Sequence, residues 1–123
     1  MGNGALGVIV DDDESMRESV AALVNQIGYV AQTFASAEAF LTSDAPSHAK
    51  CLILDIGLPG MSGPDLQHEL IRRGHSIPAI FITGRAESSI PPGLLKETGI
   101  SCLFKPFSDH EIRAALDAVL HDT

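Results

Sequence analysis

The amino-acid sequence predicts an α/β domain built on a five-stranded parallel sheet, doubly wound, with five helices. Short apolar runs alternate with segments of helical periodicity, which is the pattern of a parallel sheet covered on both faces. The 123 residues are enough for one compact domain and too few for two. We therefore expect a single domain, residues 1–123, with a core of about 6–121. A hydrophobic content of 45% supports a packed interior.

Each expected strand is a short apolar run. The five runs are residues 6–10 (LGVIV), 29–34 (YVAQTF), 51–55 (CLILD), 79–83 (AIFIT) and 101–104 (SCLF). Runs of this length are typical of strands that are buried in a parallel sheet. In such sheets ligands bind beyond the carboxyl ends of the strands, so the residues at those ends are the candidates for function.

The first expected helix has a start signal and a stop signal. Ser15 and Glu18 form a capping box, and Gly28 stands where a left-handed residue ends a helix. The apolar face between them consists of Met16, Val20, Leu23, Val24 and Ile27. This spacing predicts a helix between the first two strands.

Two more helices are expected before the fourth strand. Ser36 can cap a short helix that runs through Leu41. Pro64 fits the first turn of the next helix, and Gly74 fits its end. We expect the inward face of that helix to consist of Leu66, Leu70 and Ile71.

The last helix has the clearest pattern. Ser108 and Glu111 form a second capping box. The apolar residues that follow at helical spacing are Ile112, Ala115, Leu116, Val119 and Leu120. Before the fifth strand we expect only a short helix, from about Pro92 to Thr98, because a residue that precedes proline disfavours the helical conformation.

The composition excludes several classes of function. Sixteen acidic and eight basic residues give a formal charge of −8, so direct nucleic-acid contact by this segment is not expected. No charged and apolar leader opens the chain, and no apolar run approaches the ~20 residues that span a bilayer. We therefore expect a cytoplasmic domain without membrane contact.

Cys51 and Cys102 lie in apolar runs without metal or redox spacing, which predicts buried thiols.

Polar residues occur at the ends of four of the five expected strands. They are Asp11, Asp12 and Asp13 after the first strand, Asp55 at the end of the third, Thr83 at the end of the fourth and Lys105 after the fifth. The carboxyl ends of parallel strands share one edge of the sheet. We therefore expect carboxylates, a hydroxyl and an amine to meet at this edge.

Carboxylates that gather in this way need a compensating charge. Two unit charges ~5 Å apart repel by roughly 3 kcal/mol at an effective dielectric of ~20, and Lys105 can offset only one of them. We favour a bound Mg²⁺, a hard cation that prefers oxygen ligands. The alternative is that residues 11–13 form a solvated acidic turn that caps the following helix.

Four motifs follow one another along the chain: VIVDDDESMR, LDIGLPGMSG, FITG and FKPF. In this order and spacing they resemble the receiver domain of two-component response regulators, over roughly residues 6 to 121. The stretches FASAEAFL and DLQHEL are similar to the FixJ-type branch, whose receivers usually precede a DNA-binding domain. The resemblance implies a flavodoxin-like sheet with strand order 2-1-3-4-5.

The resemblance also implies roles for the residues at the strand ends. Asp55 matches the phosphoacceptor, which takes a phosphoryl group from a sensor histidine kinase. Asp12 matches a direct Mg²⁺ ligand, and Asp11 matches a ligand that acts mainly through water. Asp55 itself and the backbone carbonyl of Gly57 would complete the metal ligands that the protein supplies.

Further implications concern the switch and its partners. Thr83 and Lys105 match the hydroxyl and the amine that hold the phosphoryl oxygens in receivers. The implied partners are the histidine kinase, a C-terminal DNA-binding effector domain if the natural chain is longer, and a second copy in a phosphorylation-linked homodimer. Such a domain is a signalling receiver that catalyses only its own phosphorylation and dephosphorylation.

Two departures from the family pattern fall on the face through which many receivers dimerise. Cys102 stands three residues before Lys105, where most receivers have an aromatic residue. The sequence IPPG at residues 90–93 leaves room for only a short fourth helix. We therefore expect the signal to pass through an altered rearrangement of this face or through the first helix.

Two other interpretations use the same residues. Aspartate-based phosphatases also form an aspartyl phosphate, but they need a second aspartate two residues after the nucleophile, where this sequence has Gly57. The stronger alternative is a pseudoreceiver, a protein-interaction module that is not phosphorylated. The sequence argues against a pseudoreceiver because it contains the acceptor Asp55, the acid pair Asp11 and Asp12, the hydroxyl of Thr83 and the amine of Lys105.

Overall fold

The computed structural model describes residues 5–58, 60–83, 100–104 and 108–120. The strands are β1 (Leu6–Val10), β2 (Val30–Phe34), β3 (Ala49–Asp55), β4 (Ala79–Thr83) and β5 (Ile100–Phe104). They form one sheet in the order β2-β1-β3-β4-β5, and every neighbouring pair is parallel. The predicted parallel sheet and its strand order are confirmed.

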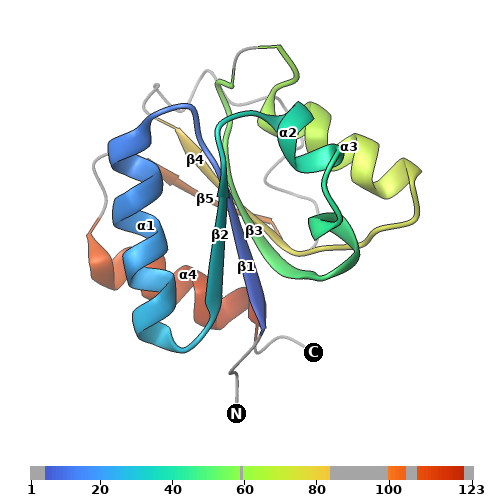
Figure 1. Ribbon diagram of the computed structural model, residues 1–123. Coiled ribbons are helices and arrows are strands. Elements are labelled where there is room, and N and C mark those ends of the chain that lie inside the picture. Colours follow the sequence, from blue (N-terminus) through green and yellow to red (C-terminus); the bar gives the residue numbers. More distant parts are fainter. Residues whose placement is uncertain (1–4, 59, 84–99, 105–107, 121–123) are drawn as a thin grey trace.

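Helices cover both faces of the sheet (Figure 1). In the described residues they are α1 (Glu14–Ile27), α2 (Ala37–Leu41), α3 (Gly63–Arg72) and α4 (Asp109–Leu120), with a 3-10 turn η1 (Ala45–Ser47) after α2. α1 and α4 lie on one face, and α2 and α3 lie on the other. The fifth predicted helix, about residues 92–98, and the IPPG segment lie outside the described residues. No described helix has the length and apolar character that a membrane span requires.

Alternate side chains of each inner strand enter two apolar clusters. On β3, Leu52 and Leu54 pack with α2 and α3, whereas Cys51 and Ile53 pack with α1 and α4. All four side chains are buried, which explains why this strand reads as an unbroken apolar run. The predicted burial of Cys51 is confirmed, and burial raises the pKa of its thiol to about 11. The side chain of Cys102 lies outside the described residues.

The start of α1 differs from the prediction. Its N-cap is Asp13, whose Oδ1 accepts the N–H groups of Ser15 (2.9 Å) and Met16 (3.3 Å). The predicted capping box of Ser15 and Glu18 is wrong, because Ser15 already lies inside the helix and an aspartate caps as well as a serine. Gly28 ends the helix in the left-handed region (φ 116°), as predicted. The buried residues of α1 are Val20, Leu23 and Val24, all on the predicted inward face.

Serine side chains cap the two helices on the other face. The Ser36 hydroxyl accepts a backbone N–H of α2 (3.1 Å), which confirms the predicted cap. In α3, Ser62 is the N-cap and Pro64 lies in the first turn, as predicted for the proline. The predicted inward position of Ile71 is wrong, since this residue is 55% exposed. The buried stripe of α3 ends at Leu70, and the next residue points about 100° away around the helix axis.

The capping box that was predicted for the last helix is present at the start of α4. The N–H of Ser108 donates to the Glu111 carboxylate (3.0 Å), and the N–H of Glu111 donates to Ser108 Oγ (3.1 Å). The buried residues of α4 are Ile112, Ala115 and Leu116, which supports the predicted inward face. The side chains of Val119 and Leu120 lie outside the described residues.

Candidate functional site

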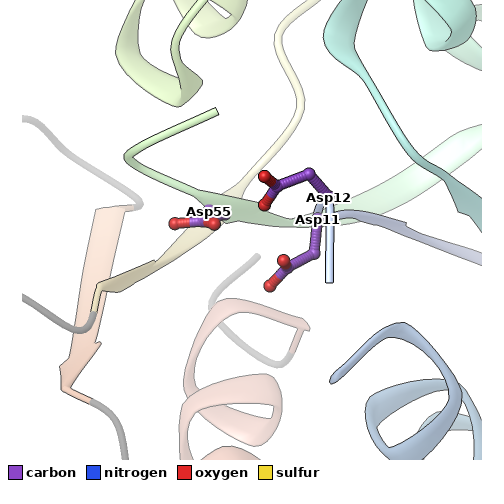
Figure 2. Close-up of side chains that lie close together, drawn as sticks. All are labelled: Asp11, Asp12 and Asp55. Atoms are coloured by element: carbon purple, nitrogen blue, oxygen red, sulfur yellow. The ribbon is translucent and has the colours of Figure 1, made fainter. Parts of the chain in front are cut away.

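The strand register brings three of the predicted site residues together. Val10 and Leu54 are partners in the β1–β3 ladder, so Asp11, which follows β1, lies beside Asp55, the last residue of β3. Asp12 is the next residue of the turn that leads into α1. Figure 2 shows the three side chains directed into a common space at this edge of the sheet.

The three carboxylates form a compact cluster. Asp11, Asp12 and Asp55 each place one carboxylate oxygen in the cluster, and these three oxygens lie within 4.8 Å of one another. Asp11 is 1% exposed, Asp55 is half-buried and Asp12 is exposed. The alternative of a helix-capping acidic turn therefore holds for Asp13, but it does not account for the buried Asp11 or for Asp55 on another strand.

Asp11 is held by its backbone as well as by its side chain. Its N–H donates to the carbonyl of Phe34 in β2 (3.1 Å), and its carbonyl accepts from Arg17 Nη1 (2.8 Å). Its Oδ1 accepts the N–H of Asp13 (2.9 Å). These bonds fix Asp11 relative to both β2 and α1.

The loop after Asp55 allows a very close approach of backbone segments. The N–H of Gly57 donates to Asp55 Oδ1 (3.1 Å), which restricts rotation of that carboxylate. At Gly63, the first residue of α3, a Cβ atom would lie 2.6 Å from the carbonyl oxygen of Asp55. A glycine at this position therefore lets α3 begin directly against the end of β3.

A side chain of α2 holds the far part of the same loop. Glu38 Oε2 accepts the N–H of Met61 (3.1 Å). The neighbouring Gly60 has a φ of 75°, and a Cβ atom there would lie 3.0 Å from the same oxygen. Glu38 thus tethers the loop that follows Asp55 to a helix on one face of the sheet.

The sequence does not single out Arg17, Glu38 or Gly63 as site residues. Arg17 and Glu38 bind backbone groups that are six and 23 residues away, and no side-chain motif marks such contacts. For Gly63 a signal does exist. A glycine within a helix has a cost in stability, and its presence there indicates a packing reason.

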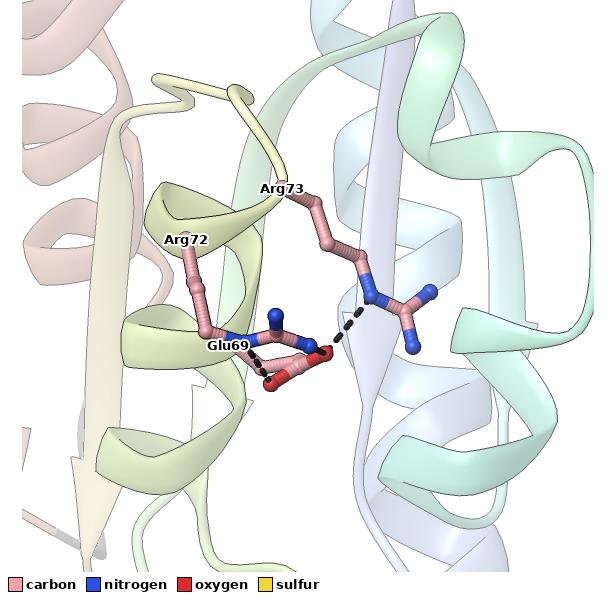
Figure 3. A network of polar contacts seen from close by, with 3 residues as sticks. All are labelled: Glu69, Arg72 and Arg73. Atoms are coloured by element: carbon pink, nitrogen blue, oxygen red, sulfur yellow. Dashed lines mark hydrogen bonds and ion pairs between the residues drawn. The ribbon is translucent and has the colours of Figure 1, made fainter.

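The basic residues at the other end of α3 are paired with a neighbour on the same helix. Arg72 and Arg73 donate through Nε to the Glu69 carboxylate at 3.0 and 2.7 Å (Figure 3). The hydrogen bonds from Arg72 and then Arg73 lower the pKa of Glu69 to about 2. Because α3 begins at Gly63, against the end of β3, and ends at Arg72, Arg72 lies about 14 Å along the helix axis from the start of α3.

The donor chemistry of the cluster fits Mg²⁺. Two unit charges at 4.8 Å repel by about 3 kcal/mol at an effective dielectric of ~20. The buried Asp11 cannot turn into solvent to relieve this repulsion. A hard divalent cation that keeps part of its water shell does relieve it. Asp11, Asp12 and Asp55 are the candidate ligands among the described side chains.

Thr83 is the last residue of β4, and Lys105 follows β5 in the sequence. The register pairs Asp55 with Ile82, and Thr83 with Phe104, so β4 and β5 end at the same edge as the cluster. The side chain of Thr83 and the whole of Lys105 lie outside the described residues. Their roles stay predictions.

An acidic cluster at the carboxyl edge of a 2-1-3-4-5 sheet is what the resemblance to receiver domains implies. The sequence matches the response regulator receiver domain family over residues 8–117. The chain belongs to this family. It is therefore a receiver domain, a signalling domain of two-component response regulators.

Curated relatives include regulators of about twice its length. The receiver domain is 41% identical to nodulation protein W of Bradyrhizobium diazoefficiens over 97% of this chain and 51% of that protein. It is 36% identical to transcriptional regulatory protein FixJ of Azorhizobium caulinodans over 91% of this chain and 53% of FixJ. The predicted likeness to FixJ is confirmed, and the chain spans about half the length of these relatives.

Solved structures agree with this assignment. The receiver domain superposes on the response regulator StyR with a TM-score of 0.86 and 34% identity, covering 96% of this chain and 60% of StyR. A response regulator receiver protein from Burkholderia phymatum gives a TM-score of 0.80 and 32% identity, with 95% of each chain covered. Both are similar to this chain in sequence as well as in fold.

Proposed function

We propose that the receiver domain accepts a phosphoryl group on Asp55 from a sensor histidine kinase, with Mg²⁺ held by Asp11, Asp12, Asp55 and the carbonyl of Gly57. The observation that carries this proposal is the cluster of three carboxylates from two strand ends within 4.8 Å. Asp55 is the member that is half-buried at a strand terminus, where a carboxylate can act as a nucleophile.

The transfer requires position and charge more than acid–base chemistry. A carboxylate oxygen of Asp55 forms a bond to phosphorus while the bond from phosphorus to the histidine nitrogen breaks, and the imidazole keeps that electron pair. Bound Mg²⁺ would neutralise charge on the phosphoryl oxygens. The N–H of Gly57, bonded to Asp55 Oδ1, orients the carboxylate for in-line attack.

Thr83 and Lys105 are the proposed sensors of the phosphoryl group. Moving a two-state domain from 1:99 to 99:1 requires ~5.5 kcal/mol, whereas one charge-assisted hydrogen bond supplies ~1.5–3 kcal/mol. Both contacts are therefore needed for a full switch. Supporting this, Thr83 ends the strand next to that of Asp55.

Thr83→Ala should separate phosphorylation from the response to it. We expect the variant to take up phosphate on Asp55 but to lose most of the accompanying conformational change, because one of the two contacts is missing. Amide chemical shifts with and without beryllofluoride and Mg²⁺ measure this change. Shifts of wild-type size in Thr83→Ala would contradict the role given to Thr83.

The proposed partners follow from the relatives and from the charge of the domain. FixJ is a transcriptional regulatory protein about twice as long as this chain. We propose that the natural protein pairs a receiver core, about residues 6–121, with a C-terminal DNA-binding effector domain and forms a phosphorylation-linked homodimer. The formal charge of −8 argues against DNA contact by the receiver domain itself.

Incubation with acetyl phosphate and Mg²⁺ tests the proposed function. We expect one phosphoryl group per chain by intact mass, sensitive to hydroxylamine, and its loss when Mg²⁺ is chelated. Asp55→Asn should abolish the adduct. Asp65→Asn, which removes an exposed acid from the first turn of α3, should leave it unchanged. No adduct on the wild-type protein would instead favour a pseudoreceiver.

A further inference from the structure

We propose that Arg17 is a positioning residue that shapes the metal site by holding the backbone of Asp11. This role rests on the proposed function of the site. Arg17 is half-buried in the first turn of α1, and its Nη1 donates to the Asp11 carbonyl oxygen at 2.8 Å. In the described part of the chain its guanidinium binds a main-chain carbonyl, so it acts on the site through the geometry of the turn.

Arg17 completes a set of contacts that encloses the turn from β1 to α1. The side chain of Asp13 caps α1, while its N–H donates to Asp11 Oδ1. The N–H of Arg17 donates to the Asp13 carbonyl at 3.0 Å, and its guanidinium reaches the Asp11 carbonyl. Asp12 therefore lies between two residues that are both fixed. Its carboxylate is exposed, but the main chain that carries it is held on each side.

A guanidinium beside a metal site has two effects of opposite sign on Mg²⁺ affinity. Its positive charge repels the cation and weakens binding. Its hydrogen bond keeps the turn in the geometry needed for binding, which strengthens binding by lowering the cost of ordering. If the hydrogen bond to the turn has the larger effect, loss of Arg17 weakens Mg²⁺ binding. If the repulsion between the guanidinium and the cation has the larger effect, loss of Arg17 strengthens Mg²⁺ binding.

Titration of the unphosphorylated protein with Mg²⁺ distinguishes the two effects. We expect Arg17→Met to weaken Mg²⁺ binding about tenfold, equivalent to about 1.4 kcal/mol. The matched control is Lys50→Met, which removes the same charge from an exposed residue on β3, about 17 Å along the strand from Asp55. We expect this control to leave the affinity within twofold of wild type. Amide shifts of Asp12 and Gly57 report binding without any phosphoryl donor.

Two measurements guard against a folding defect. Arg17→Lys keeps a cation and a donor, so we expect it to recover most of the lost affinity. In wild-type protein without Mg²⁺, the guanidinium protons of Arg17 should exchange slowly with solvent, as expected for a bonded group. The carbonyl carbon shift of Asp11 should change in Arg17→Met.

The outcomes separate this inference from the proposed function. Mg²⁺ affinity that is unchanged or stronger in Arg17→Met overturns the positioning role while leaving the metal site intact. Fast exchange of the Arg17 guanidinium in wild-type protein also overturns it. Failure of the wild-type protein to bind Mg²⁺ at millimolar concentration overturns the proposed metal site, and the positioning role with it.

Discussion

Asp11 and Asp12 are neighbours in the chain, yet they differ in burial and in hydrogen bonding. Asp11 is buried and held through its N–H, its carbonyl and its carboxylate, whereas Asp12 is exposed. A fixed carboxylate sets where negative charge accumulates. An exposed one can rotate toward an incoming cation, so the pair combines a rigid anchor with an adjustable ligand.

The buried thiol of Cys51 should make stability depend on pH in the alkaline range. Burial raises its pKa from 9.0 to about 11, so the folded state favours the protonated thiol. This contribution to the free energy of unfolding is fully present below pH 9. As the pH rises to 11, the free energy of unfolding falls by about 2–3 kcal/mol. Urea unfolding at several pH values measures this loss. In Cys51→Ala the free energy of unfolding should fall less steeply over this pH range. An equal fall in the variant and the wild type would contradict the raised pKa of Cys51.

Gly63→Ala tests the close contact between α3 and β3. Alanine in place of glycine normally stabilises a helix by up to ~1 kcal/mol. Here the new Cβ atom would lie 2.6 Å from the Asp55 carbonyl oxygen, so α3 must move away from β3. We expect the free energy of unfolding to fall by about 1–3 kcal/mol. A stabilised variant by urea denaturation would show that the contact is looser than described.

Glu38 should control the mobility of the loop that follows Asp55. Glu38→Ala removes the acceptor of the Met61 N–H, so we expect exchange of that amide to accelerate by roughly two- to tenfold. Glu38→Gln keeps an acceptor oxygen and should have a smaller effect. Asp44→Ala is the charge-matched control on an exposed residue. Equal acceleration in the control would mean that charge, and not the tether, protects the loop.

The elements differ in how far the sequence predicts them. The edge that carries Asp11 and Asp55 was predictable, because alternating apolar runs and helical segments specify a parallel sheet, and the acids follow directly from its strands. The N-cap of α1 could not be predicted from the sequence. Asp13 and Ser15 are both good caps, and the length of the preceding turn decides between them. The tether from Glu38 depends on the distance between separate segments, which local patterns do not contain.

At the scale of the whole molecule, the sheet divides the interior into two apolar clusters. Phe40 of α2 belongs to one cluster and Ile112 of α4 to the other. We expect Phe40→Leu and Ile112→Val each to lower the free energy of unfolding by about 1 kcal/mol. Their effects should add within about 0.5 kcal/mol, since the two clusters have no residue in common in the part of the chain that the structure describes. A double-mutant cycle with coupling above about 1 kcal/mol would contradict this independence.

This division has an evolutionary consequence. Two apolar clusters with no described residue in common can accumulate substitutions at different rates, because a substitution in one cluster removes no member of the other. A lineage can therefore remodel the outer surface of α1 and α4 for a new protein contact, along with the residues beneath it. The opposite layer, which supports the loop after Asp55, would be inherited intact.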